Sequence, residues 1–177
     1  MSRVLFLHGA SSSGKSTLIQ QVGVQSPTPL MHLSIDHLRD SGALDVGSYA
    51  AKGVRWRDHR AAFFDGFHRA VGAFADAGNN LIVEHILDTD CWHADLQQIL
   101  RDHAVFFVAL HTPLSVLQTR EAARGDRPKG SAEADYHNIH NGLDYDLTLD
   151  GQRDAAANAG ILLEKWEGFQ PPGAFFR

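Results

Sequence analysis

The stretch from Arg3 to Ser16 constrains the fold more than any other part of this chain. Apolar residues fill consecutive positions in Arg3–His8, as expected for a strand that helices cover on both faces. The strand runs into a loop that fits the phosphate-loop pattern of glycine, four residues, then glycine, lysine and serine. The residues concerned are Gly9, Ala10, Ser11, Ser12, Ser13, Gly14, Lys15 and Ser16, followed by Thr17. This order of strand, loop and helix predicts a nucleotide-binding α/β domain.

The phosphate loop indicates both ATP and Mg²⁺ as cofactors. Successive backbone amides and the positive end of the following helix would surround the β-phosphate. Lys15 would reach the β- and γ-phosphates, and the Ser16 hydroxyl would bind the metal ion. The alternative, a simple connection rich in serine and glycine, leaves the strand-to-helix context unexplained.

Further along the chain, short apolar runs alternate with segments of helical period, which is typical of parallel strands joined by helices. The expected strands are Leu30–Ile35, Leu81–His85, Ala104–Leu110 and Leu147–Leu149. The expected helices are Lys15–Val24, Asp58–Ala77, Cys91–Asp102, Leu114–Ala123 and Asp154–Trp166. We therefore predict a three-layer α/β fold with a mainly parallel five-stranded sheet, and one domain over residues 1–177. The tail from Gly168 is expected to be irregular and held on the surface by Phe175 and Phe176.

Composition narrows the class of protein. Apolar residues make up 44% of the chain and the formal net charge is −5, which argues against binding to nucleic acid as its main activity. The longest apolar run, Ala104–Leu110, is about a third of the ~20 residues that cross a membrane. The single cysteine and the absence of a signal-peptide pattern favour a reducing cytoplasm. No feature of the sequence supports an oligomer.

Asp36 is the candidate catalytic base. It follows the second expected strand, and ligands in parallel sheets bind beyond the carboxyl ends of the strands. A carboxylate there could accept the proton of an acceptor hydroxyl and direct its oxygen at the γ-phosphorus. The alternative is that Asp36 only caps the next helix.

Glu84 is the second candidate for the metal site, beside Ser16. It ends the apolar run Leu81–Glu84, where phosphate-loop proteins keep an acidic residue that holds magnesium through water. It could instead pair with an arginine. Asp88 and Asp90 are less favoured substitutes.

Arg120, Arg124 and Arg127 are spaced by four and three residues, so they share one face of a helix. Three guanidinium groups converging on a triphosphate would neutralise the charge of the transition state. The alternative is a solvated face paired with Glu121 and Asp126. The glycine-containing connection that follows, 125–131, favours a lid.

The segment Ser41–Arg57 contains three glycines and is expected to be irregular, as substrate loops often are. It follows Asp36 closely, so Tyr49 and Trp56 are candidate apolar walls of an acceptor pocket. They could equally pack onto the helix that begins near Asp58 as core residues.

Several features together resemble the chloramphenicol phosphotransferase-like family of phosphate-loop kinases. They are the loop Gly9–Thr17, the pair Ile35–Asp36, the run Arg120–Arg127 and the element His140–Leu147. The resemblance implies ATP-dependent phosphorylation of a small-molecule hydroxyl, which in the family's named member is the primary alcohol of an antibiotic. It also implies that Asp36 matches that family's proposed base.

Two other readings of the phosphate loop stay open. One is a metabolite or nucleoside kinase of the shikimate-kinase type, and the other is a non-catalytic ATP-binding regulatory protein. Asp36 distinguishes them, because a pure binding module needs no base beside the γ-phosphate. A GTPase is disfavoured, because Asn141-Gly142-Leu143-Asp144 lacks the lysine of the guanine-specific element.

Overall fold

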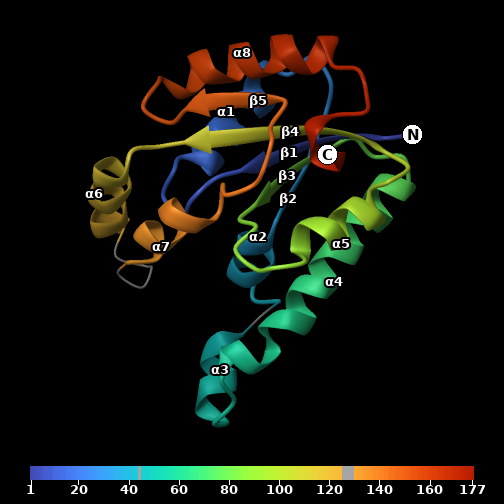
Figure 1. Cartoon of the computed structure of the whole chain (residues 1–177). Coiled ribbons are helices and arrows are strands. Elements are labelled where there is room, and N and C mark those ends of the chain that lie inside the picture. The colour runs from blue at the N-terminus through green and yellow to red at the C-terminus, as the bar shows by residue number, and fades with distance from the viewer. Residues whose placement is uncertain (44, 125–129) are drawn as a thin grey trace.

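A computed structural model describes residues 1–43, 45–124 and 130–177 of the chain. Its centre is a five-stranded parallel sheet (Figure 1). The strands are β1 (Arg3–His8), β2 (Met31–Ser34), β3 (Leu81–His85), β4 (Ala104–His111) and β5 (Leu147–Asp150). Their order across the sheet is β2-β3-β1-β4-β5, so β1 lies in the middle. The predicted α/β fold is confirmed.

The central strand shows why consecutive apolar residues are needed. Successive side chains of a strand point to opposite faces, and in β1 Leu5 and Leu7 enter one core while Val4 and Phe6 enter the other. All four are fully buried. A strand with a polar residue on either face would leave that polar group buried without water.

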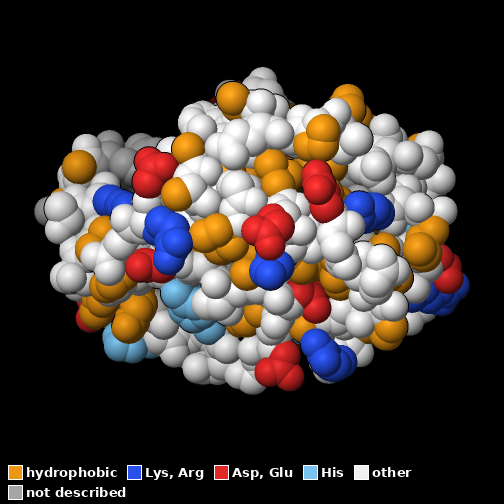
Figure 2. Space-filling view, turned by 90° about the horizontal axis from the view of Figure 1, so that it is seen from above, with side chains coloured by type: hydrophobic (Ala, Val, Ile, Leu, Met, Phe, Trp, Pro, Cys, Tyr) orange, Lys and Arg blue, Asp and Glu red, His pale blue; other side chains and the backbone are white. Residues whose placement is uncertain are grey.

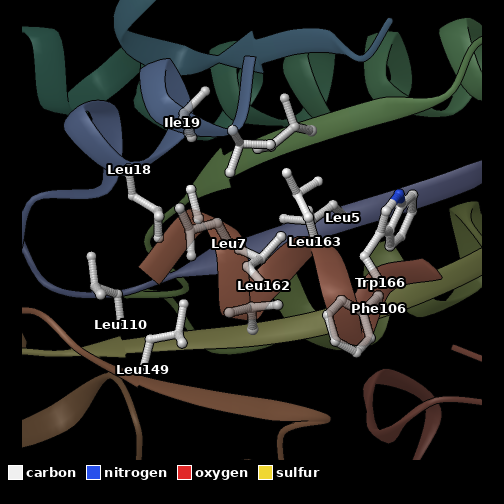
Figure 3. Close-up of a cluster of buried hydrophobic side chains, with 14 residues drawn as sticks. Leu5, Leu7, Leu18, Ile19, Phe106, Leu110, Leu149, Leu162, Leu163 and Trp166 are labelled. Carbon is white, nitrogen blue, oxygen red and sulfur yellow. The ribbon is translucent and has the colours of Figure 1, made fainter. Parts of the chain in front are cut away.

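Two pairs of helices cover the two faces of the sheet. The helices α1 (Lys15–Gln25) and α8 (Ala155–Gly168) cover the Leu5 face, and the packing of their leucines against β1 and β4 is seen in Figure 3. The helices α4 (Trp56–Asp76) and α5 (Trp92–Ile99) cover the Val4 face. The face over α8 carries scattered acidic and basic side chains among apolar ones (Figure 2). None of the helices in the described part of the chain is long and apolar enough to cross a membrane.

Two expectations about the segment after β2 are wrong. The strand ends at Ser34, and the helix α2 (Ile35–Asp40) starts at once because the Ser34 side chain caps it. The segment Ser41–Arg57 is not irregular throughout, since it contains the helix α3 (Val46–Ala51), capped by Asp45, and the first turn of α4.

The C-terminal half also departs from expectation at two places. After α6 (Leu114–Arg124), the chain forms a helix that was not predicted, α7 (Ser131–Asn138), which directly follows Gly130. Of the expected lid connection, 125–131, residues 125–129 lie outside the described residues. Phe175 anchors the tail as expected, but it does so in the core and not on the surface. In the short 3₁₀-helix Ala174–Phe176, its side chain is fully buried between the rings of Phe6 and Phe107.

Candidate active site

The phosphate loop occupies the junction between β1 and α1. Ser12 and Gly14 have left-handed backbones, with φ of 63° and 104°. Backbone amides in such turns form a concavity that binds anions. A side chain at Gly9 would lie 2.8 Å from the carbonyl oxygen of Leu110 in β4, so only glycine fits there. The loop is therefore shaped as an anion cradle at the carboxyl edge of the sheet.

Lys15 points into the curve of this loop. Its ammonium donates hydrogen bonds to the carbonyl oxygens of Gly9 (2.8 Å) and Ala10 (2.9 Å), and its side chain is buried. Lys15 also lines the large cavity described below. The charge is thus held beside the loop amides, where it can act on a bound phosphate.

Ser16 and Glu84 meet at the next turn. The Ser16 hydroxyl lies 3.1 Å from Glu84 Oε1, and His32 Nε2 lies 3.5 Å from Glu84 Oε2. Burial alone would raise the pKa of Glu84, but His32, the charge of Lys15 and the Ser16 hydroxyl together lower it below the ordinary value. The carboxylate is therefore ionised at neutral pH.

The chemistry of this pair fits magnesium. Mg²⁺ prefers hard oxygen ligands and keeps several waters, so one hydroxyl and one carboxylate are a typical protein contribution. The described residues contain no group of three or more histidine, cysteine or acidic side chains that could hold a metal. The remaining ligands would come from water and the nucleotide.

Asp36 lies on α2 and lines the same cavity as Lys15. Its backbone amide donates to the Ser34 hydroxyl at 3.2 Å, so Ser34 and not Asp36 caps the helix. Its Oδ1 lies 3.0 Å from Nη1 of Arg39, one turn further along. The carboxylate is thus oriented by its own helix at the edge of the cavity.

Arg120, the first of the three predicted arginines, contacts the phosphate loop. It donates to the carbonyl oxygens of Ser13 (2.9 Å) and Gly151 (3.0 Å), and it lines the cavity. Its neighbour Glu121 instead accepts hydrogen bonds from the backbone amides of Gly130 and Ala132. The described residues do not test the rest of the clamp, because the side chain of Arg124 and all of Arg127 lie outside them.

The cavity has a volume of about 1060 Å³ and extends to either side of the phosphate loop. One end reaches Arg153, Ala155 and Asn158, at and just before the start of α8. The other end reaches α2 and α4. Because α8 and α4 cover opposite faces of the sheet (Figure 1), the residues that line this one cavity come from both sides of the sheet.

Of the two aromatic residues predicted for the acceptor pocket, Trp56 lines the cavity. Its ring meets that of Phe63, another lining residue, at 5.4 Å in an edge-to-face arrangement. Tyr49 is not among the described lining residues; its ring stacks on His59 of α4 at 5.7 Å. The structure therefore brings Trp56, but not Tyr49, to the site.

A second ion pair at the α4 end is not evident from the sequence. Arg60 donates to both carboxylate oxygens of Asp88, at 2.7 and 2.8 Å, and both residues line the cavity. The Arg60 guanidinium lies 4.7 Å from the ring centre of Phe64 and 4.6 Å from that of Trp92. Asp88, a substitute candidate for the metal site, is thus engaged by arginine.

A comparison with protein families matches residues 2–167 to the model described as "CPT: Chloramphenicol phosphotransferase-like protein". Among curated proteins, "Putative O-phosphotransferase MT2714" of Mycobacterium tuberculosis (strain CDC 1551 / Oshkosh) is 25% identical over 195 residues. That alignment covers 99% of this chain and 87% of the relative.

Solved structures share the fold. The APS kinase CysC of Mycobacterium tuberculosis, solved in complex with AMPPNP and APS, has a TM-score of 0.66 and 22% identity, over 94% of this chain and 98% of its own. Shikimate kinase from Acinetobacter baumannii, in complex with shikimate, has a TM-score of 0.59 and 17% identity, over 93% and 92%. At these identities the likeness concerns the fold alone.

Proposed function

The chain belongs to the chloramphenicol phosphotransferase-like family of phosphate-loop kinases, and on that premise we propose that it transfers the γ-phosphoryl group of ATP to a hydroxyl group of a small molecule. One observation carries the proposal. A carboxylate that could serve as a base, that of Asp36, lines the same cavity as the phosphate-loop lysine, Lys15. A protein that only bound ATP would need the lysine but not the carboxylate.

The proposed reaction uses these residues in separate roles. Lys15 and the loop amides bind the phosphates and compensate the charge that builds up during transfer. Asp36 accepts the proton of the acceptor hydroxyl while the oxygen of that hydroxyl bonds to the γ-phosphorus. The bond between the γ-phosphorus and the β,γ-bridging oxygen breaks in the same step. ADP and a phosphate ester are the products.

Ser16 and Glu84 would hold Mg²⁺, which supplies charge neutralisation at the β- and γ-phosphate oxygens when bound. Arg120 donates a hydrogen bond to the loop carbonyl of Ser13 and supplies positive charge to the cavity that it lines. We place the nucleotide base toward Ala155 and Asn158, and the acceptor toward Trp56, because Ile35, the neighbour of Asp36, packs into the core that α4 covers.

The test is a screen of hydroxylated small molecules, chloramphenicol included, with the purified protein, ATP and Mg²⁺. Mass spectrometry detects products heavier by one phosphoryl group. Asp36→Asn should retain ATP binding and lose transfer by about 10²- to 10⁴-fold, since an amide accepts no proton.

Asp65→Asn is the matched control, because Asp65 is also a helical carboxylate paired with an arginine of its own helix, Arg69, but lies outside the cavity lining. Transfer at the parental rate by Asp36→Asn would remove Asp36 from the mechanism. ATP binding without any product in the whole panel would favour a regulatory ATP-binding protein.

A further inference from the structure

A carboxylate of α7 reaches the phosphate loop from outside the nucleotide cavity. Oδ2 of Asp135 accepts a hydrogen bond of 2.8 Å from the backbone amide of Ser11, the third residue of the loop. Ser11 lines the cavity, whereas Asp135 is not among the described residues that do. The carboxylate thus holds the loop without occupying the space for the nucleotide.

Asp135 is itself held in place by the packing of α7. The side chains of Ala132 and Ile139 are buried against Ala10 of the loop and Leu117 of α6. At the far end of α7, Nε2 of His8 donates to the carbonyl oxygen of Ile139 at 2.9 Å. Helix α7 is therefore fixed to β1 and to the loop on both sides of Asp135.

The start of α7 is fixed to α6 by a second carboxylate. Glu121 accepts hydrogen bonds of 2.9 Å from the amides of Gly130 and Ala132, and these bonds lower its pKa. The neighbouring residue, Arg120, donates a hydrogen bond to the carbonyl oxygen of Ser13 in the loop. Besides the packing against Ala10, the pair α6–α7 thus forms hydrogen bonds with the loop at two points, an amide at Ser11 and a carbonyl at Ser13.

We propose that Asp135 is a positioning residue for phosphate binding, whose carboxylate fixes the first half of the phosphate loop and couples its shape to the α6–α7 pair. The inference rests on the proposed function, because it assumes that the loop binds the phosphates of ATP. A loop held in its binding shape loses less conformational entropy when the nucleotide arrives. A charge-assisted hydrogen bond to a backbone amide is among the stronger ones in proteins.

The test compares Asp135→Ala and Asp135→Asn with Glu133→Ala, the control, an exposed carboxylate on the same helix. Titration calorimetry gives the Kd for MgATP, and thermal unfolding gives the Tm. Loss of the bond should raise the Kd of Asp135→Ala by about 10- to 100-fold. Asp135→Asn should stay within about 3-fold, since its amide oxygen still accepts from Ser11. The control should bind as the parent does.

Turnover separates positioning from a purely structural role. With an acceptor in hand, Asp135→Ala should raise the KM for ATP and leave kcat at saturating ATP within about 3-fold, because binding is what is lost. If the alanine variant does not fold, Asp135→Ser takes its place, since its side chain is too short to reach Ser11.

An unchanged Kd in Asp135→Ala, with or without a lower Tm, would overturn the inference. So would tighter binding in both variants, which would mean that the carboxylate competes with phosphate. These outcomes differ from failure of the proposed function, in which the parent protein itself binds no MgATP.

Discussion

Acid should destabilise the protein through His8, the last residue of the central strand. Its ring is fully buried, and its Nδ1 accepts from the amide of Leu87 at 3.3 Å while Nε2 donates to Ile139. These two bonds define the neutral tautomer. Burial, together with the nearby His140 and Lys15, lowers the pKa of His8 to about 3 against the opposing hydrogen bond to Ile139.

The direction in which the free energy of unfolding changes with pH follows from proton uptake by His8. Between pH 6.5 and about 3 the unfolded chain binds a proton on His8 and the folded chain does not, so the free energy of unfolding falls as the pH falls. With an unfolded pKa of about 6.5, lowering the pH from about 6.5 to about 4.5 removes about 2 kcal/mol through this one residue. The full contribution of neutral His8 to stability is present at pH values above the pKa of His8 in the unfolded chain.

Urea unfolding at both pH values, for the parent and for His8→Gln, measures this contribution. Glutamine carries an amide that can donate to Ile139 but does not titrate in this range. His68 and His140, whose pKa values are both lowered to about 4, and His85 titrate in both proteins. The difference between the two proteins therefore reports the titration of His8 together with its coupling to His85. The parent should lose about 2 kcal/mol more than the variant, and equal losses would refute a buried neutral His8.

Three further predictions concern the site. Lys15→Ala should lower turnover by about 10²- to 10³-fold, because the charge beside the transferred phosphate is lost; steady-state kinetics with an unchanged rate would contradict it. Glu84→Gln should raise the Mg²⁺ concentration needed for half-maximal activity by roughly 10- to 100-fold, and an unchanged metal titration would remove Glu84 from the metal site. Trp56→Ala should raise the acceptor KM by about 2- to 10-fold with little change in ATP binding. Tyr49→Ala should leave that KM unchanged, and equal effects in both would contradict the different positions of the two rings.

The sheet could be predicted from the sequence because its strands are buried on both faces. In Arg3–His8 and Ala104–His111 this burial demands unbroken apolar runs, which are visible without any tertiary information. The phosphate loop was predictable for a similar reason, since Gly9 and Gly14 meet local backbone and steric requirements.

The short helices could not be predicted in the same way. Helices α2, α3 and α7 have six to eight residues, span about two turns, and display too little periodicity to be recognised. Their caps are local signals that also occur in turns. The burial of Phe175 depends on a gap beside Phe6 and Phe107 that exists only once the sheet has formed.

Long-range partners account for the remainder of the site. Arg60 and Asp88 pair across 28 positions, and Asp135 meets Ser11 across 124. In the sequence, Arg60, Asp88 and Asp135 are each one charged side chain among many. Their pairing is decided by how α4 and α7 pack on the sheet, so it becomes visible only in the folded chain.

The central claim, transfer of the γ-phosphoryl group to an organic hydroxyl, is tested most directly by following a label in the γ-phosphate of ATP. The protein is incubated with labelled ATP, Mg²⁺ and a pool of hydroxylated small molecules, and the labelled products are separated. The account predicts that the label appears in an organic phosphate ester and that Asp36→Asn forms this product at least about 10²-fold more slowly. Label found solely in inorganic phosphate, or retained in ATP that the protein binds, would contradict it.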